Sequence, residues 1–297
     1  MIHTGSTSLR VVDEVAVMQA FADQLRASGR RVALVPTMGA LHAGHLALVR
    51  EARRHGDAVL VSVFVNPTQF AEGEDLDRYP RRLDADLRML EESSVVAAVF
   101  APSVVEMYPG GTGTDEGMVV DVAGLDRHLC GAHRPGHFRG VATVVLKLFN
   151  ACKPHVAFFG LKDAQQLVIL RRMVLDLLLD VQVVGVQTVR EPDGLALSSR
   201  NEYLSADERK EAVALSRAVA AAEEAIRRGE QASSAIVETM LRIIERAPLA
   251  RLQYAEVVDA RTLQPTQSLS PGSEVLAAVA VYFGNTRLID SAFVRVP

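Results

Sequence analysis

The sequence predicts an α/β fold, in which a parallel sheet is covered by helices on both faces, followed by a smaller α+β domain. Over the first two-thirds of the chain, short apolar runs rich in valine alternate with segments of helical periodicity, as buried parallel strands and their connecting helices do. After about residue 189, two helical segments come first and strand patterns follow. We therefore expect a larger domain at 1–188 and a smaller one at 189–297.

The elements of the larger domain follow from hydrophobic periodicity. We expect strands at 31–36, 58–65, 95–102, 155–160 and 181–189, and helices at 13–29, 44–56, 84–93, 140–152 and 163–177. Ligands of open parallel sheets bind outside the carboxyl ends of the strands. The stretches 36–45, 66–70 and 160–163 fall at that edge.

The smaller domain is predicted to begin with a helix at 205–229, where Ser205 stands three residues before Glu208 as in a capping box. A second helix is expected at about 232–246. Strand patterns follow at 252–260, 273–283 and 286–294.

Composition excludes several classes of function. The formal net charge is -4 and no basic stripe is present, so a nucleic-acid partner is not expected. The two cysteines form neither a disulfide framework nor a zinc motif, and we interpret them as reduced thiols. No signal peptide is visible, and charges interrupt every apolar run before it could span a membrane. We expect a cytoplasmic protein that acts on small molecules.

The stretch PTMGALHAGH, residues 36–45, places His42 and His45 where a strand passes into a helix. A helix N-terminus offers free N–H groups and a partial positive charge, which attract phosphate. Imidazoles beside it can donate hydrogen bonds to phosphate oxygens. The alternative is a pair of loop histidines that bond only to backbone. The spacing His-x-Gly-His after a buried strand favours function and resembles the nucleotidylyltransferase signature.

Two further loops carry groups suited to phosphate. Ser198, Ser199 and Arg200 lie in the loop 190–201, where hydroxyls and a guanidinium can donate to phosphate oxygens. Lys162 stands between a predicted strand and helix and can act as a point charge. Asp163 either caps the following helix or contributes one carboxylate to Mg²⁺, and the sequence leaves both open.

Neutral amides form a separate group. Asn66 and Gln69 lie at a strand end, and Gln166 lies on the helix predicted at 163–177. Amides can orient a carboxylate nucleophile by hydrogen bonds without neutralising the charge that it needs for attack. Polar residues in an ordinary turn are the alternative for either glutamine alone.

Six motifs in order resemble the pantoate–β-alanine ligase (pantothenate synthetase) family of the nucleotidylyltransferase superfamily, and the similarity runs from about residue 31 to 204. They are PTMGALHAGHLALV, FVNPTQF, DLDRYPR, RPGHFRGVATVV, FFGLKDAQQL and VREPDGLALSSRN. The resemblance implies a Rossmann-like catalytic domain at 1–188 of the HxGH type, a smaller lid domain at 189–297, ATP with Mg²⁺, and a homodimer. It also implies that pantoate and ATP give pantoyl adenylate and pyrophosphate, after which β-alanine displaces AMP to form pantothenate.

The resemblance implies site residues as well. His45 would be the catalytic proton donor, with His42, Lys162, Ser198, Ser199 and Arg200 acting on the phosphates. The pantoate and β-alanine end would be formed by Gln69, Gln166, Asn66 and Tyr79, and Asp163 is the metal candidate. The ATP site would be lined by Pro36, Thr37, Met38, Gly39, Ala40, Leu41, His42, Ala43, Gly44, His45, Gly160, Leu161, Lys162, Asp163, Val189, Leu197, Ser198, Ser199 and Arg200.

Four positions depart from the family pattern. Ala43, Cys130 and Leu161 stand where the family usually has glutamate, and Ala164 stands where it has an aromatic residue. We expect the change at 161 to remove an electrostatic partner beside Lys162. We expect Cys130 to weaken an ion pair near Arg134.

Three other functions fit the sequence less well. The nearest rival is a nucleotidylyltransferase that uses another acid or a phosphorylated acceptor. The neutral Gln69 and Gln166 argue against the phosphorylated acceptor, which would call for more arginine and lysine. A nucleotide-binding regulatory protein without catalysis is favoured by the substituted acids but disfavoured by four intact residues, His42, His45, Lys162 and Arg200. A dehydrogenase is disfavoured because no G-x-G-x-x-G follows the first strand.

Overall fold

A computed structural model describes residues 9–71, 73–112 and 117–297. The chain forms two compact units built from interleaved segments. Unit 1 runs to residue 122 and includes 134–159 and 169–186, and unit 2 consists of 123–133, 160–168 and 187–297. The domain boundary expected between residues 188 and 189 stays a prediction.

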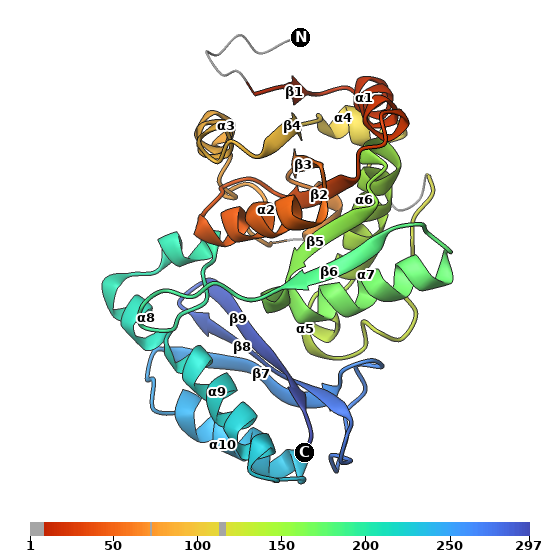
Figure 1. Cartoon of the computed structure of the whole chain (residues 1–297). Helices are drawn as coiled ribbons and strands as arrows, with labels where there is room; N and C mark the ends of the chain where they lie inside the picture. The colour runs from red at the N-terminus through yellow and green to blue at the C-terminus, as the bar shows by residue number, and fades with distance from the viewer. Residues whose placement is uncertain (1–8, 72, 113–116) are drawn as a thin grey trace. The chain divides into compact units, whose positions relative to one another are not determined.

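A six-stranded sheet in the order β1-β4-β3-β2-β5-β6 forms the centre of unit 1 (Figure 1). The pairings β1–β4, β4–β3, β3–β2 and β2–β5 are parallel, which confirms the predicted fold class. From β2 the chain first builds outward to β3 and β4 and later adds β5 on the other side. The strand order therefore reverses at β2, where open α/β sheets bind ligands. The strands are β1 (Val11–Val12), β2 (Val32–Thr37), β3 (Ala58–Val63), β4 (Val96–Phe100), β5 (Val156–Gly160) and β6 (Gln182–Val186).

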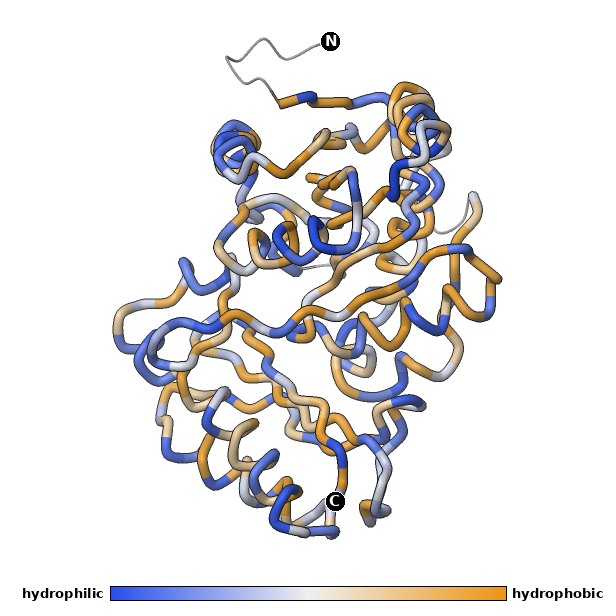
Figure 2. Tube along the Cα trace, viewed as in Figure 1, coloured by the Kyte–Doolittle hydropathy of each residue, from blue (hydrophilic) through white to orange (hydrophobic). Residues whose placement is uncertain are grey.

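Helices cover both faces of this sheet, which explains why strand residues 32–35 of β2 are all fully buried. On one face, α2 (Ala43–His55) and α3 (Leu83–Glu92) pack Val49, Ala52 and Leu90 against β2, β3 and β4. On the other, α1 (Val15–Ala27) and α6 (His137–Cys152) contact β2 and each other. The strands are largely apolar, whereas the helices carry both apolar and hydrophilic residues (Figure 2).

Further elements lie between residues 67 and 176. They are α4 (Val104–Met107), α5 (Leu129–His133), α7 (Ala164–Asp176) and the 3-10 helices η1 (Pro67–Gln69) and η2 (Leu161–Asp163). Of these, η1 and η2 follow β3 and β5 directly, so they start at the carboxyl ends of their strands.

Unit 2 contains a three-stranded antiparallel sheet in the order β7-β8-β9. Its strands are β7 (Ala250–Asp259), β8 (Glu274–Phe283) and β9 (Thr286–Arg295), and its helices are α8 (Ala206–Glu211), α9 (Ala214–Arg227) and α10 (Ser233–Ile244), with η3 (Ser199–Tyr203) before them. The core joins Leu215 and Ile226 of α9 and Met240 of α10 to Val279 and Phe283 of β8. The predicted α+β character is confirmed.

The single helix expected at 205–229 is wrong, because the chain forms α8 and α9 with a turn at Ala212–Val213. Four consecutive residues, 212–215, are buried there. All four belong to the core of unit 2, and the turn lies among them. The sequence analysis also missed β1, α4 and α5, which have two to five residues each.

Gly140 allows α6 to approach η1 closely. A Cβ atom at this position would collide with the backbone carbonyl of Thr68, which cannot rotate away. We predict that Gly140→Ala lowers the free energy of unfolding by roughly 2–3 kcal/mol through overpacking. Denaturant unfolding measures this, with Gly110→Ala as the control, since Gly110 has no atom within 4 Å of its Cβ position. Equal stability of the two variants would contradict the prediction.

Candidate active site

The two histidines cap the N-terminus of α2 reciprocally. His42 is the N-cap residue, and its Nδ1 accepts a hydrogen bond from the backbone N–H of Gly44 at 3.1 Å. His45 Nδ1 accepts from the backbone N–H of His42 at 3.2 Å. This is the arrangement of a capping box, with imidazole nitrogens in place of hydroxyl and carboxylate oxygens. The sequence analysis treated backbone bonding and function as alternatives, and the geometry allows both.

The caps determine which nitrogen of each ring carries the proton. A neutral imidazole has one N–H, and a nitrogen that accepts a hydrogen bond cannot carry it. Because both Nδ1 atoms accept, both rings present Nε2–H as their donor. The ring centroids lie 4.1 Å apart with the planes at 40°, and both side chains are half-buried. The pair thus offers two neighbouring N–H donors at a helix N-terminus.

The loop that precedes the histidines is held by polar contacts within unit 1. Thr37 donates its hydroxyl to the carbonyl of Ser62 and accepts from the N–H of Gly39. The N–H groups of Ala40 and Leu41 both donate to the carboxylate of Asp86, a residue of α3. Among the residues predicted to line ATP, Ala40 and Leu41 therefore use their backbone donors inside the protein. Of the others in this stretch, Ala43 is exposed, Pro36, Met38 and Gly44 are half-buried, and Thr37 and Gly39 are buried.

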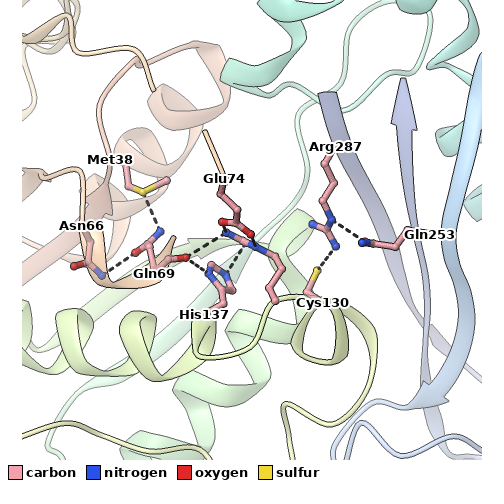
Figure 3. A network of polar contacts seen from close by, with 9 residues as sticks. Met38, Asn66, Gln69, Glu74, Cys130, His137, Gln253 and Arg287 are labelled. Carbon is pink, nitrogen blue, oxygen red and sulfur yellow. Dashed lines mark hydrogen bonds and ion pairs between the residues drawn. The ribbon is translucent and has the colours of Figure 1, made fainter. Parts of the chain in front are cut away.

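Gln69 lies in η1 with its amide fixed at both ends (Figure 3). Its Oε1 accepts from Asn66 Nδ2 at 3.1 Å, and its Nε2 lies 2.9 Å from the sulfur of Met38. This places the predicted pantoate residue beside the loop that leads to the histidines. Tyr79, 6% exposed, presents its ring edge-on to that of Phe70.

Asn66 is 1% exposed, and the protein satisfies its amide group. Its Nδ2 donates to Gln69 Oε1 and to the carbonyl of Gly140, and its Oδ1 accepts from the hydroxyls of Thr68 and Tyr108. These contacts indicate that Asn66 orients Gln69.

The backbone of Gln69 has a separate support (Figure 3). Its carbonyl accepts from Arg134 and lies 2.7 Å from His137 Nδ1. Arg134 also lies 3.0 Å from His137 Nε2 and makes a two-point ion pair with Glu74, at 2.7 and 2.6 Å. A guanidinium can only donate, so Nε2 accepts and His137 carries its proton on Nδ1, which donates to Gln69. The ion pair thereby fixes both the histidine tautomer and the position of η1.

In unit 2, Lys162 lies in η2, directly after β5. Its ammonium group is 3.3 Å from the carboxylate of Asp163, and the Lys162 side chain is 21% exposed. The hydroxyl of Ser291, on β9, bonds to the backbone carbonyls of Leu161 and Lys162, both at 3.3 Å. The loop 160–163 is thus tied to the three-stranded sheet. Gln166, on the first turn of α7, is half-buried.

The loop 189–201 is tied to the same strand. Asp290 of β9 is buried and makes a two-point ion pair with Arg190, at 2.6 and 3.0 Å. The loop folds back on itself, since the N–H of Leu197 donates to the carbonyl of Val189. It ends in η3, which Ser198 caps by accepting from the N–H of Arg200, and Ser199 is the first residue of η3. Adjacent residues of β9 therefore hold the two segments of unit 2 in which phosphate ligands are predicted.

Comparison with known proteins identifies the family. The family model described as pantoate-beta-alanine ligase matches residues 10–293. The chain belongs to the pantoate–β-alanine ligase family. Pantothenate synthetase from Salinibacter ruber is 63% identical over 97% of this chain and 98% of its own length. The enzyme of the same name from Geobacter sulfurreducens is 50% identical over 95% of this chain and 98% of its own.

Solved structures of the family agree with this fold. The crystal structure of pantothenate synthetase from Thermus thermophilus has a TM-score of 0.87 at 46% identity and covers 96% of this chain and 99% of its own. Pantoate-beta-alanine ligase from Francisella tularensis has a TM-score of 0.76 at 30% identity and covers 96% of this chain and 97% of its own. That structure is described as complexed with beta-gamma ATP and beta-alanine. Within the described residues, no helix combines the length and apolar character needed to cross a bilayer.

One expectation about the departures from the ligase pattern is wrong. Arg134 keeps a complete ion pair with Glu74, and Cys130 faces a different arginine. In unit 2, Cys130 Sγ lies 3.3 Å from Arg287 (Figure 3). It also lies 3.2 Å from the hydroxyl of Tyr254. Burial raises the pKa of Tyr254 well above its usual value, so this hydroxyl stays protonated and can donate to the sulfur. Sequence spacing gave no indication of which arginine Cys130 would meet.

Asp86, Asp290, Ser291 and Glu74 were missed by the sequence analysis. Each contacts its loop through a side chain that only the folded chain brings near, and Asp86 lies 45 positions from Leu41. The one available signal for Asp86 was its position on the apolar face of a predicted helix, three residues after Leu83 and four before Leu90. The others had none.

The ion pair of Glu74 and Arg134 gives a pH-dependent prediction. Burial raises the pKa of Glu74, but the hydrogen bond and charge of Arg134 outweigh it, and the pKa lies below its usual value. The ionised group therefore stabilises the fold above about pH 4.5, and this contribution is lost as the pH falls through the lowered pKa. We predict that Glu74→Gln costs roughly 1–3 kcal/mol at neutral pH and progressively less in acid.

Urea unfolding between about pH 7 and pH 3 measures this difference, with Glu92→Gln, an exposed residue of α3, as the control. A Glu74→Gln penalty that stays constant across this range would show that the ion pair does not carry the effect.

Proposed function

We propose that this chain condenses pantoate with β-alanine to give pantothenate, with ATP converted to AMP and pyrophosphate. Membership of the ligase family supports this, as do the ligands in the Francisella tularensis structure. The observation that carries the proposal is the imidazole pair of His42 and His45, whose Nδ1 atoms cap α2 while Nε2 remains the donor. Such donors are suited to oxygens on which negative charge develops.

The reaction follows from the chemistry of the groups. A carboxylate oxygen of pantoate attacks the α-phosphorus of ATP, and the bond to the bridging oxygen breaks, so pyrophosphate leaves with the electron pair. The amine of β-alanine then attacks the acyl carbon of pantoyl adenylate, releases AMP and loses a proton. His42 and His45 would donate through Nε2 to phosphate oxygens in the first step. Positioning and charge then supply most of the catalysis.

The remaining phosphate roles belong to Lys162, Ser198, Ser199 and Arg200. Lys162 would supply a point charge and Arg200 a planar pair of donors. Residues 36–45, 160–163, Val189 and Leu197 would line the nucleotide. Asp86 already accepts from the N–H groups of Ala40 and Leu41, so these two groups would not donate to the phosphates. The loop 36–45 would contact the nucleotide through its other groups.

Pantoate would be held by Gln69 and Gln166, with Tyr79 shaping the adjacent wall. Gln69 carries an amide that is already oriented, so little side-chain freedom is lost on binding. Asn66 acts at this end by holding Gln69. Neutral amides leave the carboxylate of pantoate charged for attack.

Magnesium is proposed as the companion of ATP. Among the described residues, no group of three or more histidine, cysteine, aspartate or glutamate side chains could hold a metal ion. Mg²⁺ commonly takes one or two carboxylates together with substrate phosphates. The partly exposed carboxylate of Asp163 fits that pattern, and the ion would offset phosphate charge. We also propose a homodimer, a cytoplasmic location and a lid role for residues 189–297.

Pyrophosphate exchange tests the first step. We expect labelled pyrophosphate to enter ATP only when pantoate is present, before β-alanine is added, because adenylate formation is reversible and needs no amine. Omission of pantoate is the control. ATP binding with no exchange would instead favour a regulatory nucleotide-binding protein, and exchange with a different acid would change the substrate.

His45 should matter far more to rate than to stability. We predict that His45→Ala slows pantoate-dependent exchange by about 100- to 1,000-fold, the loss typical of one oriented oxyanion donor. Loss of its cap should cost only about 1 kcal/mol of unfolding free energy. His55→Ala, at the exposed end of the same helix, is the matched control. Exchange at the control rate would remove His45 from the mechanism.

A further inference from the structure

Asp86 of α3 clamps the loop that carries the histidines. Its Oδ2 accepts from the N–H of Ala40 at 3.0 Å, and its Oδ1 accepts from the N–H of Leu41 at 2.8 Å. The residue is 2% exposed. A buried carboxylate whose two oxygens each hold one of two consecutive peptide groups fixes both the position and the direction of the chain there.

The clamped backbone is one that the chain would not adopt unaided. Gly39 has φ +80° and Ala40 has φ +50°, both in the left-handed region. For alanine this conformation costs about 1–2 kcal/mol. A Cβ atom on Gly39 would lie 3.0 Å from Asp86 Oδ2 and 3.1 Å from Val63, which leaves no room for a side chain. The contacts of Asp86 offset the strain that the backbone carries.

The strained segment leads directly into the imidazole pair. Leu41 is followed by His42, the N-cap of α2, whose ring accepts from the N–H of Gly44 in the first turn. The orientation of both rings depends on the N–H of His42 and the N–H of Gly44. A shift of the peptide at residues 40–41 would therefore move the N-cap and both Nε2 donors together.

We infer that Asp86 is a positioning residue for adenylation, which holds His42 and His45 in their donating geometry without touching substrate. The inference rests on the proposed function of the histidine pair. The consecutive N–H groups of Ala40 and Leu41 could bind an anion and lie beside a proposed phosphate site. The positioning role explains why they are not available to phosphate. The protein fills them with its own carboxylate.

Substitutions at Asp86 separate charge from shape. Asp86→Asn keeps the size but has one acceptor oxygen, so its NH₂ group faces a backbone donor. Asp86→Ala leaves both donors without a partner in a buried site. Asp84→Asn is the matched control, because it makes the same charge change two residues away on the exposed side of α3.

The experiment measures pantoate-dependent pyrophosphate exchange on folded protein. We expect Asp86→Ala to lower kcat by about 100-fold and Asp86→Asn by about 10-fold, since small misplacements of catalytic groups cost this much. The KM for pantoate should stay within about twofold, because Gln69 is held by Asn66, Arg134 and His137. Asp84→Asn should match the unsubstituted protein.

Nitrogen NMR of the histidine rings supplies a readout that a purely structural role would not change. The unsubstituted protein should show Nε2–H tautomers for His42 and His45, and folded Asp86→Asn should show mixed tautomers. If the unsubstituted protein does not catalyse exchange, the proposed function fails regardless of Asp86. If it does, and folded Asp86→Asn matches Asp84→Asn in both rate and tautomers, the positioning role is wrong. The asparagine variant decides the question even if the alanine variant does not fold.

Discussion

The requirement on which the site depends is that the first turn of a helix needs acceptors for its backbone N–H groups. In α2 those acceptors are imidazole nitrogens, not the usual hydroxyl and carboxylate oxygens. One contact therefore does two things: it completes the helix and determines which ring nitrogen keeps the proton. Without the capping hydrogen bonds, the tautomer of each histidine ring would no longer be fixed. This is why backbone bonding and function are compatible at this position.

The loops of unit 1 meet because of the sheet topology. Parallel strands β2 and β3 end at one edge, and residues 38 and 69, which follow them, are in contact there. Each loop is then fixed by charged groups from further along the chain, the buried Asp86 for the first and the half-buried pair of Arg134 and Glu74 for the second. The same device recurs in unit 2, where Asp290 pairs with Arg190. Strands bring the functional segments together, and distant charges set their exact path.

The sequence was sufficient to predict the strands and helices that show hydrophobic periodicity or long apolar runs. Apolar runs such as 58–61, which the structure buries, predict strands covered on both faces, and a histidine pair after such a run predicts a phosphate site. Very short elements and long-range pairs were not accessible in this way. The two residues of β1 are too few to show periodicity, and the turn at 212–213 interrupts a helical pattern that continues on both sides of it. Asp86, Asp290 and Cys130 meet partners that only the completed backbone determines.

The contacts of Lys162 and Arg287 show which groups are affected by the substitutions at 161 and 130. At position 161 leucine replaces an acid, but Asp163 keeps a carboxylate 3.3 Å from the ammonium group of Lys162. The half-buried guanidinium of Arg287 has the sulfur of Cys130 and the amide oxygen of Gln253 as acceptors (Figure 3). Neutral acceptors satisfy the N–H donors but offset less of the charge than a carboxylate would. Any cost of this substitution therefore falls on the packing of unit 2, while the Glu74 and Arg134 pair that supports Gln69 is unaffected.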